Sequence, residues 1–293
     1  MVSENLTNKT MERSDLDSAK ARSVILELNS LISDLKDKDL KISSWYGSFE
    51  LTGEKDSAEW INRGYNYEPM EEAVDDRNFP WFLYWEIAWV TMNAEFTQGQ
   101  KVLDLGGSSS LFSYYLACKG LDVTTIDLQE RLVKNADQVA QHTGWKLKNY
   151  VMDMRELDFE SRFDHITSIC VYEHIPVYDR AEVNKSIGKL LLPHGRFSIT
   201  FDYRNPSRFA RISTPRDVDR QFVKPSGLVV RGNRLFSDSG DSYLLHPFYY
   251  PGVSWRYRLS QVRRGHFRPW EIARVKKVND YTFGALFQEK AAE

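Results

Sequence analysis

Acidic residues end successive apolar runs in the middle of this chain, and each could hold one part of a nucleotide. Asp104 lies in the run KVLDL, and Asp127, 23 residues further on, ends LDVTTID. A carboxylate at the tip of a second strand can accept hydrogen bonds from both vicinal hydroxyls of a ribose. Asp153, in NYVMDMREL, could accept a hydrogen bond from the exocyclic amine of a base. These spacings predict a ligand that contains a nucleoside.

The turn between Asp104 and the next apolar stretch is made of two glycines and three serines, Gly106 to Ser110. Glycines let the backbone turn sharply and approach a ligand closely. A serine can cap the helix that follows, and the start of such a helix offers free N–H groups. The alternative is an ordinary strand-to-helix turn in a parallel sheet, which also favours Gly and Ser.

A doubly wound α/β sheet would bring these residues to one edge, because the carboxyl ends of its parallel strands meet there. Apolar runs that alternate with helical patterns predict such a sheet. We predict strands over 101–105, 121–127, 150–152, 163–174 and 196–202, and helices over 111–119, 130–142 and 180–192.

Together these motifs resemble the class I S-adenosylmethionine-dependent methyltransferases. The stretches that carry the resemblance are VLDLGG, TTIDL, MDM, ICVYEHI and LLLPHGRFSITFD. The resemblance implies a mostly parallel, seven-stranded sheet completed by a C-terminal antiparallel strand pair, here 273–279 and 281–290. This chain differs from the family at one motif: the usual Gly-x-Gly-x-Gly is replaced by Gly106-Gly107-Ser108-Ser109-Ser110. The serines would supply extra hydroxyls near the methionine moiety of the cofactor.

The resemblance also implies a cofactor site for S-adenosylmethionine. Its expected contacts are Asp104, Gly106, Gly107, Ser108, Asp127, Leu128, Asp153, Met154 and Val171. The rival for this architecture is a dinucleotide dehydrogenase, whose fingerprint needs a third glycine where Ser110 stands. S-adenosylmethionine has no phosphate, so its loop tolerates that loss.

Methylation of a hydroxyl or amine requires a general base, and three side chains are candidates: His174, Glu173 and Asp202. His174 is favoured because it is expected directly after a strand and its ordinary pKa suits the task. The alternative is that His174 only orients the substrate or caps a turn. Expected substrate contacts are Tyr65, Tyr203, Arg204 and the more distant candidate base His246.

The chain divides into a helical and aromatic N-terminal extension, 1–95, and a methyltransferase domain, 96–293. We expect Met1–Arg13 to be disordered and an amphipathic helix to begin at Ser14, capped by Ser14 and Asp17. The aromatic stretch around Tyr65 is either a lid over the cofactor or ordinary surface packing.

Basic residues gather between residues 203 and 268, which hold 13 Lys and Arg against four acids, although the whole chain has a net charge of −2. Arginines recognise carboxylates and phosphates well. We therefore expect a small-molecule or glycan acceptor with negative charge, such as a phosphorylated, nucleotide-linked or carboxylated sugar. The alternative is that these arginines pair with acids of the same chain. A pI near 6.3 disfavours nucleic acid as a partner.

Composition excludes several other classes of protein. The most apolar stretch, 79–90, is too short to span a membrane and contains Glu86, and no signal peptide is evident. We expect a cytoplasmic enzyme with no metal site, in which Cys118 and Cys170 are reduced core residues. A homo-oligomer, an RNA or protein methyltransferase, and a cofactor-binding protein without catalysis all stay open.

Overall fold

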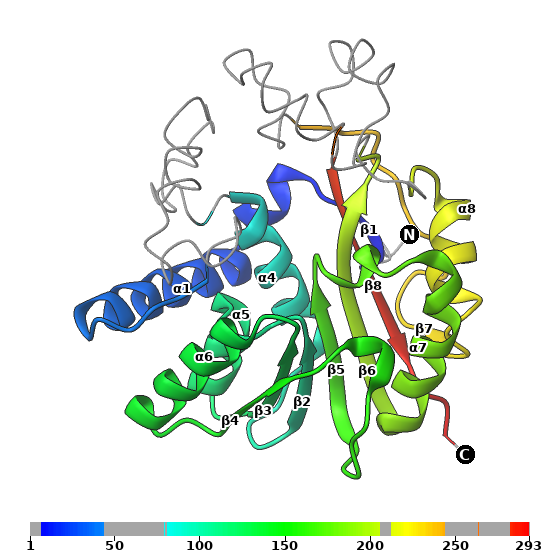
Figure 1. Cartoon of the computed structure of the whole chain (residues 1–293). Helices are drawn as coiled ribbons and strands as arrows, with labels where there is room; N and C mark the ends of the chain where they lie inside the picture. The colour runs from blue at the N-terminus through cyan, green and yellow to red at the C-terminus, as the bar shows by residue number, and fades with distance from the viewer. Residues whose placement is uncertain are drawn as a thin grey trace.

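The computed structural model describes residues 7–43, 79, 81–205, 212–243, 263 and 282–292. Its centre is a mixed sheet of eight strands in the order β1-β8-β6-β5-β2-β3-β4, with β7 paired to β8. The strands are β1 (Lys9–Thr10), β2 (Lys101–Leu105), β3 (Asp122–Asp127), β4 (Leu147–Val151), β5 (Phe163–Ile169), β6 (Leu191–Tyr203), β7 (Val229–Val230) and β8 (Thr282–Glu289). Strands β2 to β6 pair in parallel, and β8 runs antiparallel to β6 (Figure 1). The predicted doubly wound fold is confirmed.

The strand order reverses between β2 and β5, which are neighbours in the sheet although two strands separate them in the chain. In open α/β sheets, ligands bind at the carboxyl ends of the strands beside such a switch point. The turn after β2 and the turn after β5 therefore lie next to each other at the edge where the acids were expected.

Helices cover both faces of the sheet (Figure 1). They are η1 (Arg13–Asp17), α1 (Ala19–Asp37), α4 (Trp81–Ala94), α5 (Leu111–Cys118), α6 (Glu130–Thr143), η2 (Met154–Glu156), η3 (Tyr172–His174), α7 (Val177–Leu190), α8 (Pro215–Val218) and η4 (Asp219–Val223). One core cluster joins α1, α4 and α5 to strand residues such as Val102 and Phe283. The other joins α7 and η4 to Leu103, Ile166 and Phe197 on the opposite face. Alternate residues of one strand thus serve opposite cores.

Several predicted boundaries were wrong. Strand β4 spans Leu147–Val151 instead of 150–152, and β5 ends at Ile169 instead of His174. The β5 strand stops early because Cys170 has a positive φ of 54°, outside the extended region, and a 3-10 turn follows. Strand β6 begins at Leu191 and includes the Pro193–Gly195 segment predicted as a separate turn. His174 is therefore not the residue that follows the strand.

The N-terminal segment also differs from its prediction. Residues 7–13, expected to be disordered, are ordered: β1 pairs antiparallel with β8, and the buried Asn8 side chain accepts a hydrogen bond from the Phe287 backbone N–H at 2.8 Å. Edge pairing satisfies backbone groups that a polar composition alone does not reveal. The helix cap is Ser18, whose hydroxyl accepts from Ala21 N–H at 3.1 Å, not Ser14.

The buried face of the N-terminal helix was predicted correctly. Its apolar residues at helical spacing are all buried: Ala21, Val24, Ile25, Leu28, Leu31, Ile32 and Leu35. Cys118, expected in the core, is exposed at the end of α5. Among the described helices, none is both long and apolar enough to cross a bilayer. The second predicted C-terminal strand, 273–279, lies outside the described residues.

Candidate functional site

The turn after β2 requires glycine at two successive positions. Gly106 has a φ of +78°, and a Cβ there would lie 2.5 Å from Val171 Cγ1. A Cβ on Gly107 would lie 1.9 Å from Asp104 Oδ2 and 2.7 Å from Ser113 Oγ. Real side chains do not tolerate such distances, so the paired glycines let the backbone close over Asp104 and contact the turn after β5. The contact between Gly106 and Val171 joins the two sides of the switch point.

Asp104 is buried beneath this turn and is held by two hydroxyls. Ser113 donates to Oδ2 at 2.6 Å and Thr167 donates to Oδ1 at 2.9 Å. Burial raises the pKa of Asp104 to about 6, although both hydrogen bonds favour the ionised form, and the nearby Asp127 adds to the increase. Since Ser113 is on α5 and Thr167 on β5, the carboxyl group of Asp104 ties the turn to both neighbours.

The raised pKa of Asp104 predicts a pH-dependent stability. A carboxyl group whose pKa rises from 3.8 to about 6 on folding binds protons more tightly in the folded state. Protonation of Asp104 therefore stabilises the folded state by about 3 kcal/mol below about pH 4. This stabilisation is lost as the pH rises through about 6. In the Asp104→Asn variant, we expect the free energy of unfolding not to fall in this way between about pH 4 and 6. Urea unfolding of both proteins at a series of pH values measures it, and parallel stability curves would contradict the prediction.

The serines of the turn are used to hold the turn itself. Ser108 Oγ lies 2.7 Å from Thr125 Oγ1, and Ser109 donates to the Leu132 backbone oxygen at 2.7 Å. Both serines are buried, and Ser109 has a φ of +63°, a conformation that a glycine would adopt more easily. Ser110 caps α5 by accepting from Ser113 N–H. The hydroxyls of Ser108 and Ser109 therefore hold the turn in place, and the predicted contact of Ser108 with the cofactor stays a prediction.

The predicted ribose-binding acid, Asp127, lies at the end of β3, beside the turn. Its Oδ1 accepts a hydrogen bond from Gln129 N–H at 2.9 Å. Burial raises the pKa of Asp127, and backbone N–H groups of Gln129 and Leu128 partly offset that increase. Leu128 is 70% exposed, so the residue after the acid presents an apolar side chain to this edge. The carboxyl end of β3 thus combines a carboxylate with an uncovered apolar surface.

The next acid along the edge, Asp153, is held by a neighbouring arginine. It caps η2, and its two oxygens accept hydrogen bonds from Arg155 at 2.6 to 3.1 Å. Hydrogen bonding to Arg155 holds the pKa of Asp153 below its usual range. Met154, the first residue of η2, is half-buried beside it. Binding of a base amine by Asp153 would compete with this ion pair.

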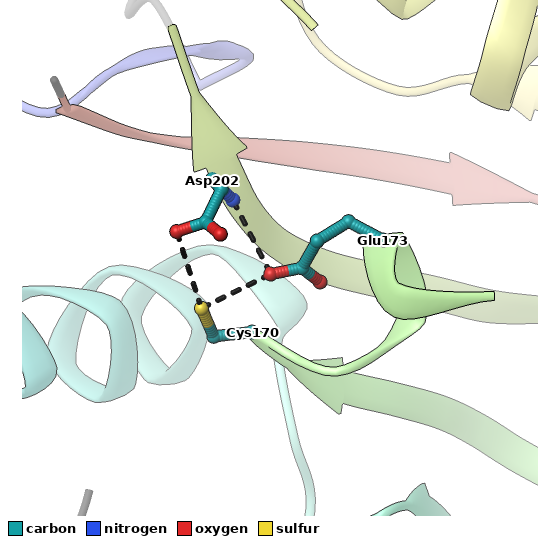
Figure 2. A group of neighbouring side chains, drawn as sticks. All are labelled: Cys170, Glu173 and Asp202. Atoms are coloured by element: carbon teal, nitrogen blue, oxygen red, sulfur yellow. Dashed lines mark hydrogen bonds between the residues drawn. The ribbon is translucent and has the colours of Figure 1, made fainter. Parts of the chain in front are cut away.

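Two of the three candidate bases are buried in contact with each other, and the third is exposed. Glu173 and Asp202 are buried, and the Asp202 backbone N–H donates to Glu173 Oε1 at 3.3 Å (Figure 2). The Cys170 thiol donates to the same oxygen at 3.1 Å. His174, predicted to follow the strand, is instead an exposed residue at the end of η3.

Sequence reasoning missed Cys170 and Glu86 as members of this acidic group. Glu86 is fully buried on α4, where burial, followed by the charges of Glu173 and Asp202, raises its pKa well above the usual value. Burial and the same acids raise the pKa of the Cys170 thiol. A lone acid inside the apolar stretch 79–90 was the signal for Glu86.

The expected substrate residues that the structure describes bind other parts of the chain. The Tyr203 hydroxyl donates to Asp238 at 2.9 Å, and Arg204 contacts Asp238 and the Asp241 backbone oxygen. Further basic residues of the segment 203–268 also form ion pairs: Arg220 with Asp217, Lys224 with Asp219, and Arg231 with Glu95 and Glu289. Tyr65 and His246 lie outside the described residues.

Comparisons with known proteins identify the part of the chain that carries the site. Residues 102–195 match the family described as a methyltransferase domain. A ubiquinone biosynthesis O-methyltransferase from Bordetella avium is 31% identical over 125 residues, which are 42% of this chain and 51% of the relative. A Pseudomonas aeruginosa protein of the same description is 26% identical over 182 residues, 58% of this chain and 73% of the relative. The chain thus spans only about half the length of the first of these relatives.

Solved structures share the fold at low sequence identity. The cyclase SpnF has a TM-score of 0.56 and 12% identity, with 87% of this chain and 99% of SpnF covered. A candidate sarcosine dimethylglycine methyltransferase from Galdieria sulphuraria has a TM-score of 0.52 and 16% identity, with 83% and 96% covered. These likenesses establish the fold alone. The matched methyltransferase domain, residues 102–195, contains the paired-glycine turn and the strand-end acids Asp104, Asp127 and Asp153.

Proposed function

We propose that this protein transfers a methyl group from S-adenosylmethionine to a small-molecule acceptor, with oxygen as the favoured acceptor atom. The observation that carries the proposal is the paired-glycine turn, closed over Asp104 and placed between the carboxyl ends of β3 and β5. The domain match over residues 102–195 and the O-methyltransferase relatives support it.

The residues at this edge fit the cofactor in charge and shape. Gly106 and Gly107 let the turn close over Asp104 and pack against Val171, which places the backbone of the turn at the edge where the cofactor would bind. Asp127 would accept hydrogen bonds from the two ribose hydroxyls, and the exposed Leu128 would pack against the base. When bound, the cofactor supplies a methyl group on a positively charged sulfur. The main work of the protein is then to hold the acceptor in line with that group and to exclude water.

An acceptor hydroxyl must lose its proton when its oxygen is methylated. His174, Glu173 and Asp202 lie around the carboxyl ends of β5 and β6, where that proton could be taken up. The exposed His174 is the candidate that water can reach, and its ordinary pKa lies near neutral pH. We therefore assign the base role to His174 and not to the two buried acids.

Replacing His174 with alanine should lower turnover about 100-fold or more, in the range typical of a lost general base. The affinity for S-adenosylmethionine should stay near that of the wild type, because His174 is not among the residues expected to contact the cofactor. Steady-state kinetics and calorimetric titration measure the two effects separately. A large loss of cofactor affinity would contradict the assignment, and unchanged turnover would transfer the base role to another residue.

Negative charge on the acceptor remains part of the proposal. Arg204, Arg220 and Arg231 pair with acids of the chain, so the proposal depends on other arginines of the segment 203–268, such as the exposed Arg216 and Arg234. A screen of matched acceptors with and without a phosphate or carboxylate group tests it. Equal turnover of the charged and uncharged acceptors would contradict the preference for negative charge, without contradicting the proposal that oxygen is methylated.

The decisive experiment is calorimetric titration of the full-length protein with S-adenosylmethionine and, separately, with NAD. We expect binding of the first alone, followed by transfer of labelled methyl to an acceptor in the screen. Binding of NAD alone would overturn the proposal in favour of a dehydrogenase. Binding of S-adenosylmethionine without transfer to any acceptor would favour a cofactor-binding protein.

A further inference from the structure

Four side chains from three separated parts of the sequence meet at the carboxyl ends of β5 and β6: Cys170, Glu173, Asp202 and Glu86. We call them the acidic cluster. Cys170 Sγ lies 3.1 Å from Glu173 Oε1 and 4.0 Å from Asp202 Oδ1 (Figure 2). One donor atom from each of Cys170, Glu173 and Asp202 lies within 4.8 Å of the others. Glu86 approaches them from α4, which packs against β6 and β8.

Two carboxyl groups of this cluster, Glu86 and Glu173, have oxygens without a hydrogen-bond partner among the described residues. Glu86 is 0% exposed and Glu173 is 6% exposed. The Thr200 hydroxyl lies near Glu86, but neither Glu86 oxygen has a hydrogen-bond partner among the described residues. Glu173 Oε2 likewise has none there. Buried carboxylates are normally paired with a cation or bound to a metal, because leaving them unpaired costs several kcal/mol.

We propose that the acidic cluster binds a divalent metal ion of the zinc and cobalt type. A tetrahedral ion with a thiolate ligand at about 2.3 Å and a carboxylate oxygen at about 2.0 Å places sulfur and oxygen about 3.5 Å apart. The two sulfur–oxygen distances, 3.1 and 4.0 Å, bracket that value. A sulfur ligand among carboxylates favours zinc or cobalt over magnesium or calcium, which bind oxygen ligands.

Glu173, Asp202 and Cys170 are the ligands in this proposal, and Glu86 is the candidate fourth ligand. The proposal replaces the sequence-based expectation of a site without metal. It does not depend on methyl transfer, because it rests on side chains whose contacts are independent of any cofactor. Val171 follows Cys170 and touches Gly106, so the ion would lie beside the turn assigned to the cofactor.

Cobalt is the probe that identifies the sulfur ligand, since a thiolate bound to Co²⁺ gives a charge-transfer absorption in the near ultraviolet. The full-length protein, treated with a chelator and kept reduced, is titrated with Co²⁺ in the absence of S-adenosylmethionine. We expect the absorption to saturate at one equivalent and to disappear when Zn²⁺ is added. Zn²⁺ should also raise the thermal unfolding temperature, and a chelator should reverse that increase.

The chain contains two cysteines, which provide a matched pair of variants. Cys170→Ser should abolish the charge-transfer absorption, whereas Cys118→Ser, at an exposed site on α5, should keep it. Glu173→Gln should weaken Co²⁺ binding at least tenfold, and circular dichroism checks that each variant is folded. The wild-type titration keeps the test valid if a variant fails to fold.

Absence of both the wild-type absorption and the Zn²⁺-dependent stabilisation would overturn the proposal. Retention of the absorption in Cys170→Ser would also overturn it, because the sulfur would then come from elsewhere. Titration with methylammonium and ethanolamine examines the competing ligand class: binding of an amine without binding of Zn²⁺ or Co²⁺ would assign the cluster to a cationic acceptor instead. Calorimetry with S-adenosylmethionine is separate, so failure of the metal site leaves the methyltransferase proposal intact.

Discussion

Replacing Asp127 with alanine should weaken S-adenosylmethionine binding about 100-fold or more. The carboxylate at the end of β3 is assigned two hydrogen bonds to the ribose, and bonds to a charged group are each worth about 1.5–3 kcal/mol. No described neighbour is positioned to replace it, since the next acid along the edge, Asp153, is held by Arg155. Calorimetric titration of the variant measures the loss.

Asp122 provides the control for this variant, because it begins the same strand at the opposite edge of the sheet. Asp122→Ala should bind S-adenosylmethionine with nearly wild-type affinity. If Asp127→Ala also bound with wild-type affinity, the ribose site would have to lie elsewhere, and the assignment of β3 as the nucleoside-binding strand would be withdrawn.

Replacing Gly107 with alanine should lower the free energy of unfolding by about 3 kcal/mol or more and abolish cofactor binding. The new Cβ would lie 1.9 Å from Asp104 Oδ2, so either the turn or the buried carboxyl group must move. Movement of Asp104 breaks its hydrogen bonds with Ser113 and Thr167, and overpacking adds to that cost. Urea unfolding and calorimetric titration measure the two losses.

Gly188, inside α7, is the matched control, because no atom lies within 4 Å of a Cβ added there. Gly188→Ala should stabilise the protein by up to about 1 kcal/mol, since alanine has the higher helix propensity. Adding Asp104→Ala to the Gly107→Ala variant removes the clashing carboxyl group and should recover part of the lost stability. A Gly107→Ala protein as stable as the wild type would contradict the steric argument.

The local sequence pattern predicted the structure correctly wherever that structure depends mainly on residues close together in the chain. The helical spacing of Ala21 to Leu35 predicted the buried face of α1, and the alternation of runs and turns from Lys101 onwards predicted the parallel sheet. Boundaries failed where a tertiary contact overrides the pattern. The apolar run after Ile169 looks like a continuing strand, but Cys170 turns out of the sheet and places Glu173 in the interior.

The prediction of disorder for residues 7–13 failed for a related reason. Residues 7–13 carry no local signal of order, yet β8 supplies backbone partners for β1, and Asn8 joins β8 to the segment near Arg231. In the segment 203–268, Arg204, Arg220 and Arg231 pair with Asp238, Asp217 and Glu289, so part of its positive charge is neutralised within the chain. Charge counts do not show which opposite charges lie nearby in space.

The amino-acid sequence by itself determined the class of fold, the strand-end acids and the glycine turn, because periodicity and turn chemistry act over a few residues. Only the tertiary structure decided which side chains face one another. It made Ser108 and Ser109 supports of the turn, buried Glu173 while its neighbour His174 stays exposed, and placed Glu86 of α4 close enough to Glu173 and Asp202 for their charges to act on it. Those contacts join residues up to about a hundred positions apart, and their energies depend on burial that no local pattern encodes.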